Sequence, residues 1–151
     1  MKIEERIREL NLEIPETVKP IGAYLPALLS GNYIYVSGQL PFLNGELVHP
    51  GLLGSDVTIE QGFEAARICA LNSLSAIKSV FSDLDKIKRI VKINGYVSSE
   101  RGFNDQPKII NGASEFFFQV FGESGRHARS AVGVPVLPMG SCVELDLIAE
   151  I

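Results

Sequence analysis

Residues 143–150 read VELDLIAE, and their side chains alternate along the chain between two kinds. Successive side chains of a β-strand point to opposite faces of its sheet, so an alternating pattern sorts them into two faces. The sequence therefore predicts a strand over 142–150 in a sheet with one apolar face and one polar face. The apolar face would carry Val143, Leu145, Leu147 and Ala149, and the opposite face Glu144, Asp146, Ile148 and Glu150.

Four further strands are predicted from runs of β-branched and aromatic residues bounded by turn formers. Two of them would form a hairpin around Ser30-Gly31-Asn32, where glycine and asparagine favour a tight turn. Residues 42–56 contain four glycines or prolines and are expected to form a loop. The predicted strands cover residues 27–29, 33–37, 89–97 and about 129–136.

Apolar residues at spacings of three and four predict three helices. The first is a short amphipathic helix over 2–10, followed by a proline-containing segment that should be irregular or extended. The second covers 59–80 and begins after Thr58, which has the spacing of a capping box. The third covers about 107–121, with Gly122 as its C-terminal stop.

The order of strands, helix, strand, helix and strands predicts an α+β fold in which two helices pack on one face of a mixed sheet. We expect residues 1–18 to form an N-terminal helix and extended arm, and 19–151 to form one domain. The other sheet face carries Tyr33, Tyr35 and Ile148. Because an incompletely covered face is a common contact surface between identical chains, we expect self-association.

Composition and charge narrow the class of protein. Hydrophobic residues make up 46% and charged residues 21%, a mixture typical of soluble domains. The net charge of −4 and the scattered Lys and Arg residues argue against nucleic acid as a partner. No apolar run reaches the roughly 20 residues of a membrane span, and the charged N-terminus is unlike a secretory signal. These features predict a cytoplasmic protein without a membrane partner.

Metal binding and disulfide bonding have little support in the sequence. The two histidines, His49 and His127, are far apart, and no CxxC or HExxH spacing occurs, so no metal site is expected. His127 could act as an acid or base, but no recognisable nucleophile accompanies it, and we expect a supporting role. Cys69 and Cys142 lie in unrelated contexts and are expected to be free buried thiols.

The segment 127-HARSAVGV-134 places an arginine at the start of an apolar strand. A guanidinium keeps its charge in proteins and is costly to bury without an anionic partner. Arg129 could hold a substrate carboxylate through two parallel hydrogen bonds. Alternatively, it could pair with Glu144 or Asp146 on a neighbouring strand, or lie at an exposed strand end. The residues of this segment leave the three possibilities open.

Other candidate site residues lie near strand ends and on the third helix. Glu144 could orient or deprotonate a water, and partial burial would raise its pKa, or it could be an ordinary acid on a polar face. Tyr24 could supply a hydroxyl or an aromatic wall, or simply pack over the edge of the core. Ser37-Gly38 follows a strand, where loops often build sites, although a plain turn also explains it. Asn111 is interpreted as a structural amide, and the small residues 112–114 would let this helix approach another backbone closely.

Taken together, these segments resemble the reactive intermediate deaminase family, also called the Rid or YjgF family. The resemblance covers nearly the whole chain after residue 19. Its most specific part is an arginine followed by small and apolar residues, then Leu-Pro, a turn, Val-Glu and an alternating strand. The segments that carry it are 22-GAY-24, 31-GNYIYVSGQLP-41, 72-NSLSAI-77, 91-VKINGYVSS-99, 110-INGASEFF-117 and 129-RSAVGVPVLPMGSCVELDLIA-149.

The resemblance implies a chorismate-mutase-like fold and a homotrimer with a barrel-like core and clefts at the subunit interfaces. Arg129 matches the family's arginine, which grips the carboxylate of a 2-imino or 2-enamino acid, and Glu144 matches the acid near the attacking water. The implied reaction is hydrolysis to a 2-oxo acid and ammonia, without a metal or cofactor. The positions that match the lining of the cleft are Tyr24, Ser37, Gly38 and Asn111, with Ala131 contributing mainly its backbone where the family often has cysteine.

The chain has Gly22-Ala23-Tyr24-Leu25 where the family often has Gly-Pro-Tyr-Ser. The N-terminal helix, the longer 42–56 loop and the start 127-HAR-129 indicate a divergent branch. We expect an enamine/imine deaminase that acts on small carboxylates. The alternative is a non-catalytic binding or regulatory trimer that holds a small carboxylate in the same cleft. An endoribonuclease or translation-inhibitor activity, attached to the family by name, is weakened by the acidic charge balance. A chorismate mutase activity would rest on fold analogy alone.

Overall fold

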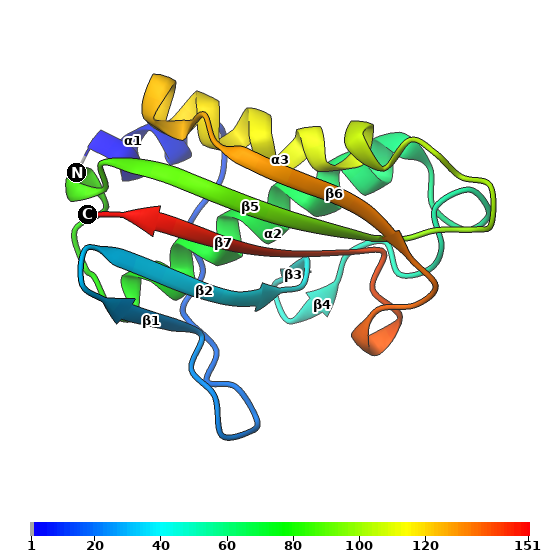
Figure 1. The fold of residues 1–151 in the computed structure, drawn as a ribbon, viewed down its shortest axis with the longest axis horizontal. Coiled ribbons are helices and arrows are strands. Elements are labelled where there is room, and N and C mark those ends of the chain that lie inside the picture. The colour runs from blue at the N-terminus through cyan, green and yellow to red at the C-terminus, as the bar shows by residue number, and fades with distance from the viewer. Residues whose placement is uncertain (1) are drawn as a thin grey trace.

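A mixed sheet forms the centre of the computed structural model, which describes residues 2–151 (Figure 1). Its strands are β1 (Ala27–Ser30), β2 (Tyr33–Gln39), β5 (Arg89–Ser98), β6 (Ala128–Val134) and β7 (Val143–Glu150). The α-helices are α1 (Lys2–Glu9), α2 (Ile59–Lys78) and α3 (Gln106–Phe121). The strand order is β1-β2-β7-β5-β6. The β5–β6 pair is parallel, and the other pairs of this sheet are antiparallel.

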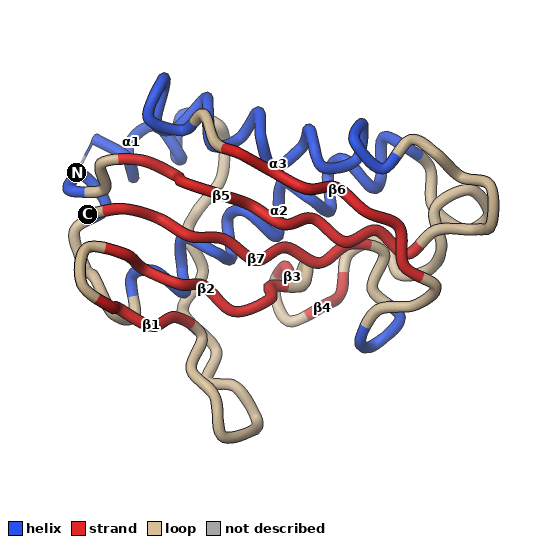
Figure 2. Tube along the Cα trace, viewed as in Figure 1, coloured by secondary structure: helices blue, strands red, loops and turns tan. Residues whose placement is uncertain are grey.

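The predicted α+β fold, with two helices on one face of a mixed sheet, is confirmed. Figure 2 shows α2 and α3 along one side of the sheet, and α1 packs at one end against α3. Alternate strand residues such as Ile93 and Leu145 are fully buried beneath these helices, together with Phe116 of α3. The opposite face of the sheet has no helix over it in the described chain.

Local sequence signals set the ends of the two long helices. Thr58 and Gln61 form the predicted capping box, because each side chain accepts the backbone N–H of the other, at 3.1 and 3.0 Å. α3 ends where Gly122 adopts a φ of 63° and donates its N–H to the carbonyl of Phe118. Between the helices, a Cβ added to Gly112 would lie 2.0 Å from the carbonyl oxygen of Phe63. The predicted close approach of α3 to another backbone is therefore present.

The segment predicted as a loop over 42–56 contains a short hairpin. β3 (Phe42–Leu43) pairs with β4 (Glu46–Leu47) in antiparallel fashion. Between them, Asn44 and Gly45 adopt φ angles of 52° and 80°. Asn-Gly with two positive φ angles is the preferred two-residue hairpin turn, and its twist matches that of the flanking strands. The loop prediction was therefore wrong for the four strand residues, Phe42–Leu43 and Glu46–Leu47.

β6 is shorter at its C-terminal end than the sequence predicted. The prediction was about 129–136, whereas the strand is Ala128–Val134. Pro135 has no N–H with which to extend the ladder, and the chain then turns through a 3₁₀ helix at Pro138–Gly140.

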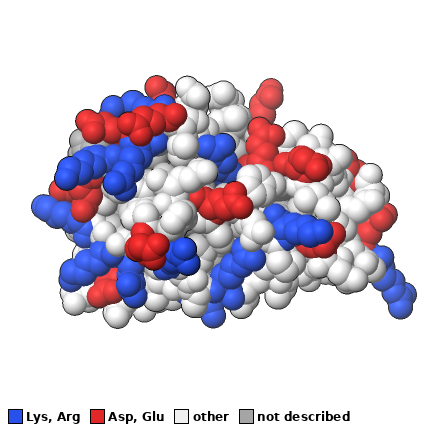
Figure 3. All heavy atoms as spheres, turned by 90° about the horizontal axis from the view of Figure 1, so that it is seen from above, with Lys and Arg blue, Asp and Glu red and all other residues white. Residues whose placement is uncertain are grey.

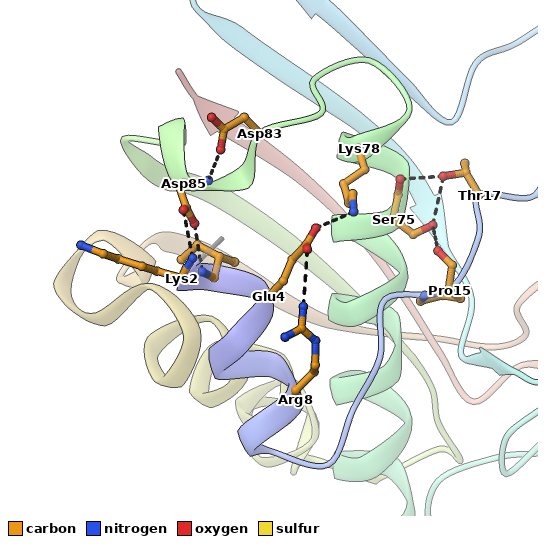
Figure 4. A network of polar contacts seen from close by, with 10 residues as sticks. Lys2, Glu4, Arg8, Pro15, Thr17, Ser75, Lys78, Asp83 and Asp85 are labelled. Atoms are coloured by element: carbon orange, nitrogen blue, oxygen red, sulfur yellow. Dashed lines mark hydrogen bonds and ion pairs between the residues drawn. The ribbon is translucent and has the colours of Figure 1, made fainter.

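The predicted N-terminal helix and extended arm lie against the rest of the chain (Figure 4). The first two residues of α1 donate their N–H groups to Asp85, each at 2.9 Å, so a remote carboxylate caps this helix. Glu4 forms an ion pair with Lys78 at the end of α2. Farther along the arm, the hydroxyl of Thr17 donates to the carbonyl of Ser75 at 2.7 Å. The arm is therefore fastened along α2 by polar contacts.

The uncovered face of the sheet carries exposed apolar side chains, as predicted. Tyr33 and Tyr35 of β2 are 41% and 47% exposed, and Leu28 of β1 is 53% exposed. Ile148 lies opposite Tyr35 in the β2–β7 register and belongs to the same face. A contiguous apolar area of this kind is typical of a contact surface.

Candidate functional site

Arg129 lies on the edge strand β6, in register with Ile93 of β5. Ile93 is fully buried beneath the helices, so Arg129 projects from the helix side of the sheet as well. Its Nη1 donates to Ser114 Oγ at 3.0 Å, and its Nη2 donates to the carbonyl oxygen of Pro107 at 3.3 Å. Both acceptors belong to α3 and are neutral. Within residues 2–151, Arg129 takes part in no ion pair.

The alternative in which Arg129 pairs with Glu144 or Asp146 is excluded within one chain. β5 lies between β6 and β7, so the arginine and the two acids are not on neighbouring strands. Glu144 and Asp146 alternate with the buried residues of β7 and therefore face the uncovered side of the sheet. The guanidinium and the carboxylates lie on opposite faces.

Asn111 and Ala131 lie on the same side of the sheet as Arg129. Pro107, Asn111 and Ser114 are spaced as i, i+4 and i+7, which places them on one stripe of α3. Because Arg129 contacts both Pro107 and Ser114, Asn111 lies between its two points of contact. Ala131 follows two positions along β6 on the same face, in register with Gly95. Three of the predicted site residues are thus gathered at the β6–α3 edge.

Glu144 lies on the uncovered face, close to the backbone of Gly38. A Cβ added to Gly38 would be 2.1 Å from Glu144 Oε1, so this carboxylate occupies space that only glycine leaves open. Burial raises the pKa of Glu144, and the charge of Asp146 raises it further. This is the direction expected from the sequence. A carboxyl group with a raised pKa exchanges its proton more readily near neutral pH.

Two polar residues of β5 were not singled out from the sequence. Asn94 Nδ2 donates to Asp146 Oδ1 at 2.8 Å, and the Tyr96 hydroxyl donates to Oδ2 at 2.9 Å. Burial, and then the hydrogen bond to Asp146, raises the pKa of Tyr96, which keeps the hydroxyl a donor. The available signal was the alternation of Asn94 and Tyr96 with Ile93, Gly95 and Val97, which puts them on the face of Glu144 and Asp146.

Tyr24 and Ser37 lie at the edge of the same uncovered face. The Ser37 hydroxyl donates to the carbonyl of Leu25 at 2.6 Å and so ties the Tyr24 loop to the end of β2. Tyr24, Ser37, Leu28 and Tyr35 contribute to the lining of a shallow pocket of about 400 Å³. The Tyr24 ring is 57% exposed and is therefore accessible from solvent.

The predicted site residues therefore form two groups, and one chain does not bring the groups together. The resemblance implied clefts at the subunit interfaces, and the alternation along the strands sends the two groups to opposite faces of the sheet of one chain. The arginine group consists of Arg129, Asn111 and Ala131, and the acid group consists of Glu144, Gly38, Ser37 and Tyr24.

Ser114 contacts Arg129, although the sequence indicated only that Ser114 is a small residue on the third helix. Its Oγ lies 2.9 Å from Nε2 of His127, for which a supporting role was predicted. The helical spacing from Pro107 and Asn111 could have identified Ser114, because all three lie on the stripe that faces the start of β6.

Among residues 2–151, no three His, Cys, Asp or Glu side chains are grouped so that they could hold a metal ion. No helix in that range has the length and apolar character needed to cross a membrane.

Cys69 and Cys142 are free and buried, as predicted. Burial raises the pKa of both thiols, that of Cys142 to about 11, so both are poor nucleophiles.

The arrangement of helices on a mixed sheet agrees with a known family. The family described as "YjgF/chorismate_mutase-like, putative endoribonuclease" matches residues 4–151. The chain belongs to this YjgF family, and the resemblance read from its sequence is confirmed.

Individual relatives cover nearly the whole chain. Protein TCP17 of Trypanosoma cruzi is 40% identical over 151 residues, which span 99% of this chain and 94% of the relative. A 2-iminobutanoate/2-iminopropanoate deaminase of Dermatophagoides farinae is 32% identical over 142 residues, 93% of this chain and 94% of its own. A crystal structure of a protein of unknown function from Agrobacterium tumefaciens has a TM-score of 0.94 and 45% identity, covering 99% of this chain and 92% of that one.

Proposed function

We propose that this chain hydrolyses small 2-imino and 2-enamino acids to 2-oxo acids and ammonia, in clefts formed between copies of the chain. The observation that carries the proposal is the Arg129 guanidinium, which contacts only neutral acceptors and takes part in no ion pair among residues 2–151. The 32% identity to a protein named as a 2-imino acid deaminase supports the same chemistry.

Arg129 would bind the substrate carboxylate. A guanidinium has more N–H donors than the two bonds to Ser114 and Pro107 use, and its planar fork matches the two oxygens of a carboxylate. The half-buried setting at the β6–α3 edge strengthens such a contact, because fewer waters compete for the donors. Binding there would fix the position of the adjacent imine carbon.

Glu144 would move the protons of the hydrolysis. A 2-enamino acid first becomes its 2-imino form by moving one proton from nitrogen to carbon. Water then adds to the C=N carbon and gives one proton to the carboxylate, which passes it to nitrogen. The carboxylate next takes the proton of the new hydroxyl group and passes it to the same nitrogen, so that ammonia leaves as the C–N bond breaks and the C=O bond forms. Substrate and one water account for all atoms of the 2-oxo acid and ammonia. An iminium carbon is already electrophilic, so holding the carboxylate and one water in place supplies much of the acceleration. The raised pKa of Glu144 suits a group that must both accept and return a proton.

The site would be completed by a second copy of the chain. Because the arginine and acid groups lie on opposite faces of one sheet, Arg129 of one copy would meet Glu144 of another. The exposed apolar side chains of the uncovered face, including Tyr35 and Leu28, suit burial against that copy. A closed ring of such contacts is the homotrimer that the family resemblance implies.

The test is turnover of 2-aminoacrylate generated in situ, followed by the release of pyruvate. The wild type should accelerate this release. Arg129→Ala should reduce the rate of pyruvate release by roughly 30-fold or more, which is the effect of losing a charge-assisted hydrogen-bonded contact. Arg126→Ala is the matched control, since Arg126 is an exposed arginine that stacks on Phe118 and should be dispensable. A wild type that gives no acceleration would overturn the deaminase proposal.

The second candidate function is binding of a small carboxylate without turnover, which can be tested with the same protein. If the wild type binds pyruvate through Arg129 but does not accelerate its release, the chain is a small-carboxylate-binding or regulatory protein. The endoribonuclease named in the family description is less well supported, because the net charge is −4 and both signs of charge are interspersed on the face in Figure 3. RNA cleavage that survives Arg129→Ala would favour it.

A further inference from the structure

His127 is held in one tautomer by its two hydrogen bonds. Its Nδ1 lies 2.6 Å from the carbonyl oxygen of Gly125, and because a carbonyl only accepts, Nδ1 carries the proton. Nε2 is then the acceptor nitrogen, 2.9 Å from Ser114 Oγ, so the serine hydroxyl donates to it. The neutral ring therefore fixes the direction in which the Ser114 hydroxyl points.

The direction of the Ser114 hydroxyl determines what it offers to Arg129. With its proton directed at His127, Oγ presents only lone pairs to the guanidinium, and Nη1 of Arg129 donates to it at 3.0 Å. The Pro107 carbonyl accepts from Nη2, so the guanidinium is held at two of its nitrogens. The result is a directed chain of hydrogen bonds from Arg129 through Ser114 to His127 and Gly125.

The surroundings of His127 keep the ring neutral. Burial lowers its pKa most, and the nearby charge of Arg129 lowers it further, against the opposing hydrogen bond to Gly125. The groups that face the ring are Ser114 and Phe117 of α3, the latter edge-on at 6.0 Å between centroids, with Arg129 as the charged one. A protonated ring would donate through Nε2 to the same oxygen that serves Arg129 and would place two cations around it.

We propose that Ser114 and His127 are positioning residues, which orient the Arg129 guanidinium for a carboxylate before that carboxylate arrives. The inference rests on the proposed function of Arg129 and adds the two residues that hold its guanidinium in place. An arginine side chain that is already ordered gives up less conformational freedom when the ligand binds. Removal of either residue should therefore weaken the binding of the carboxylate rather than the chemical step.

The first experiment needs no ligand. Nitrogen-15 NMR of the full chain should show His127 as the neutral Nδ1–H tautomer at pH 7, with His49→Gln used to assign the two rings. Rotation of the Arg129 guanidinium about Nε–Cζ should be several-fold faster in Ser114→Ala than in the wild type. An Nε2–H tautomer, or unchanged rotation in Ser114→Ala, would overturn the inference whether or not the protein turns over any substrate.

The second experiment compares two ligands that differ in charge. Dissociation constants for pyruvate and for its uncharged amide, pyruvamide, are measured for the wild type, His127→Phe, His127→Gln and the control His49→Phe. Gln keeps an acceptor near the place of Nε2, whereas Phe keeps the ring shape without one. We expect pyruvate to bind about tenfold more weakly to His127→Phe, with recovery in His127→Gln and little change for pyruvamide.

The outcomes separate this inference from the proposed function. Equal losses for both ligands, or no recovery in His127→Gln, would show a structural role and overturn the positioning role. A wild type that does not bind pyruvate more tightly than pyruvamide would instead contradict the proposed role of Arg129. The NMR measurement would still test the series of hydrogen bonds from Arg129 to Gly125 independently.

Discussion

At the scale of single residues, the sheet keeps a cation, Arg129, apart from an acid, Glu144. Arg129 projects toward α3, where Ser114 and Pro107 offer it only neutral oxygens. Glu144 projects from the other face, close to Gly38 and beside Asp146. Among residues 2–151 neither group takes part in an ion pair. Hydrolysis of a substrate that carries a carboxylate and an imine carbon would use both groups.

Arg129→Lys separates charge from geometry. Lysine keeps the positive charge but cannot form two parallel hydrogen bonds with a carboxylate. We expect pyruvate to bind about tenfold more weakly than in the wild type, as measured by isothermal titration calorimetry. Equal affinity of the two proteins would mean that Arg129 acts as a point charge or does not touch the ligand.

Glu144→Gln should change how stability depends on pH. Burial raises the folded-state pKa of Glu144 above its unfolded value, so its contribution to stability is present at low pH and is lost as pH rises through the folded pKa. Relative to Glu144→Gln, the wild type should therefore become less stable as pH rises from about 4 to 7, in urea unfolding at fixed protein concentration. Glu115→Gln, which removes one exposed carboxylate of α3, corrects for net charge. A difference that grows in the opposite direction would contradict the raised pKa of Glu144.

At the scale of elements, α3 approaches α2 closely at Gly112. Gly112→Ala would place a methyl group 2.0 Å from the carbonyl oxygen of Phe63, and backbone on both sides would have to move. We expect a loss of roughly 3 kcal/mol in the free energy of unfolding, measured by urea denaturation. Glu115→Ala, on the exposed side of the same helix, should change it by less than about 0.5 kcal/mol. Similar effects of both substitutions would show that the helices have room to separate.

The positions of the helices and strands were predicted from the sequence better than the pairing of the strands. Apolar periodicity is local, so the helices and long strands could be located with ends wrong by one or two residues, as at Val134 of β6. The β3–β4 hairpin was missed because two-residue strands carry almost no periodicity, although Asn44-Gly45 is a turn signal.

Strand order depends on pairing between segments that are distant in the sequence. Local sequence patterns therefore do not predict the strand order. The insertion of β5 between β6 and β7 is such a pairing. It is one reason why Arg129 and Glu144, which the resemblance placed in one cleft between subunits, are apart within one chain. The family resemblance implied both residues and a subunit interface, but the division of the site between the two faces depends on the folded chain.

At the scale of the whole molecule, the uncovered sheet face should be the contact between copies. Tyr35→Glu puts a charge in the middle of its exposed apolar side chains and should convert the oligomer to monomers, since a buried unpaired carboxylate is costly. Light scattering coupled to size-exclusion chromatography measures the mass. Val80→Glu, a similar change just after α2, should leave it unaltered. A Tyr35→Glu protein that keeps the wild-type mass would place the interface elsewhere.

Mixing two inactive variants tests most directly whether Arg129 and Glu144 meet across two chains. Arg129→Ala and Glu144→Gln proteins are unfolded, combined in equal amounts and refolded together, and pyruvate release from 2-aminoacrylate is compared with that of each variant alone. If the site takes its arginine from one copy and its acid from another, about a quarter of the sites regain both groups, and about a quarter of wild-type activity returns. A mixture as inactive as its two components, beside an active wild type, would contradict the shared site.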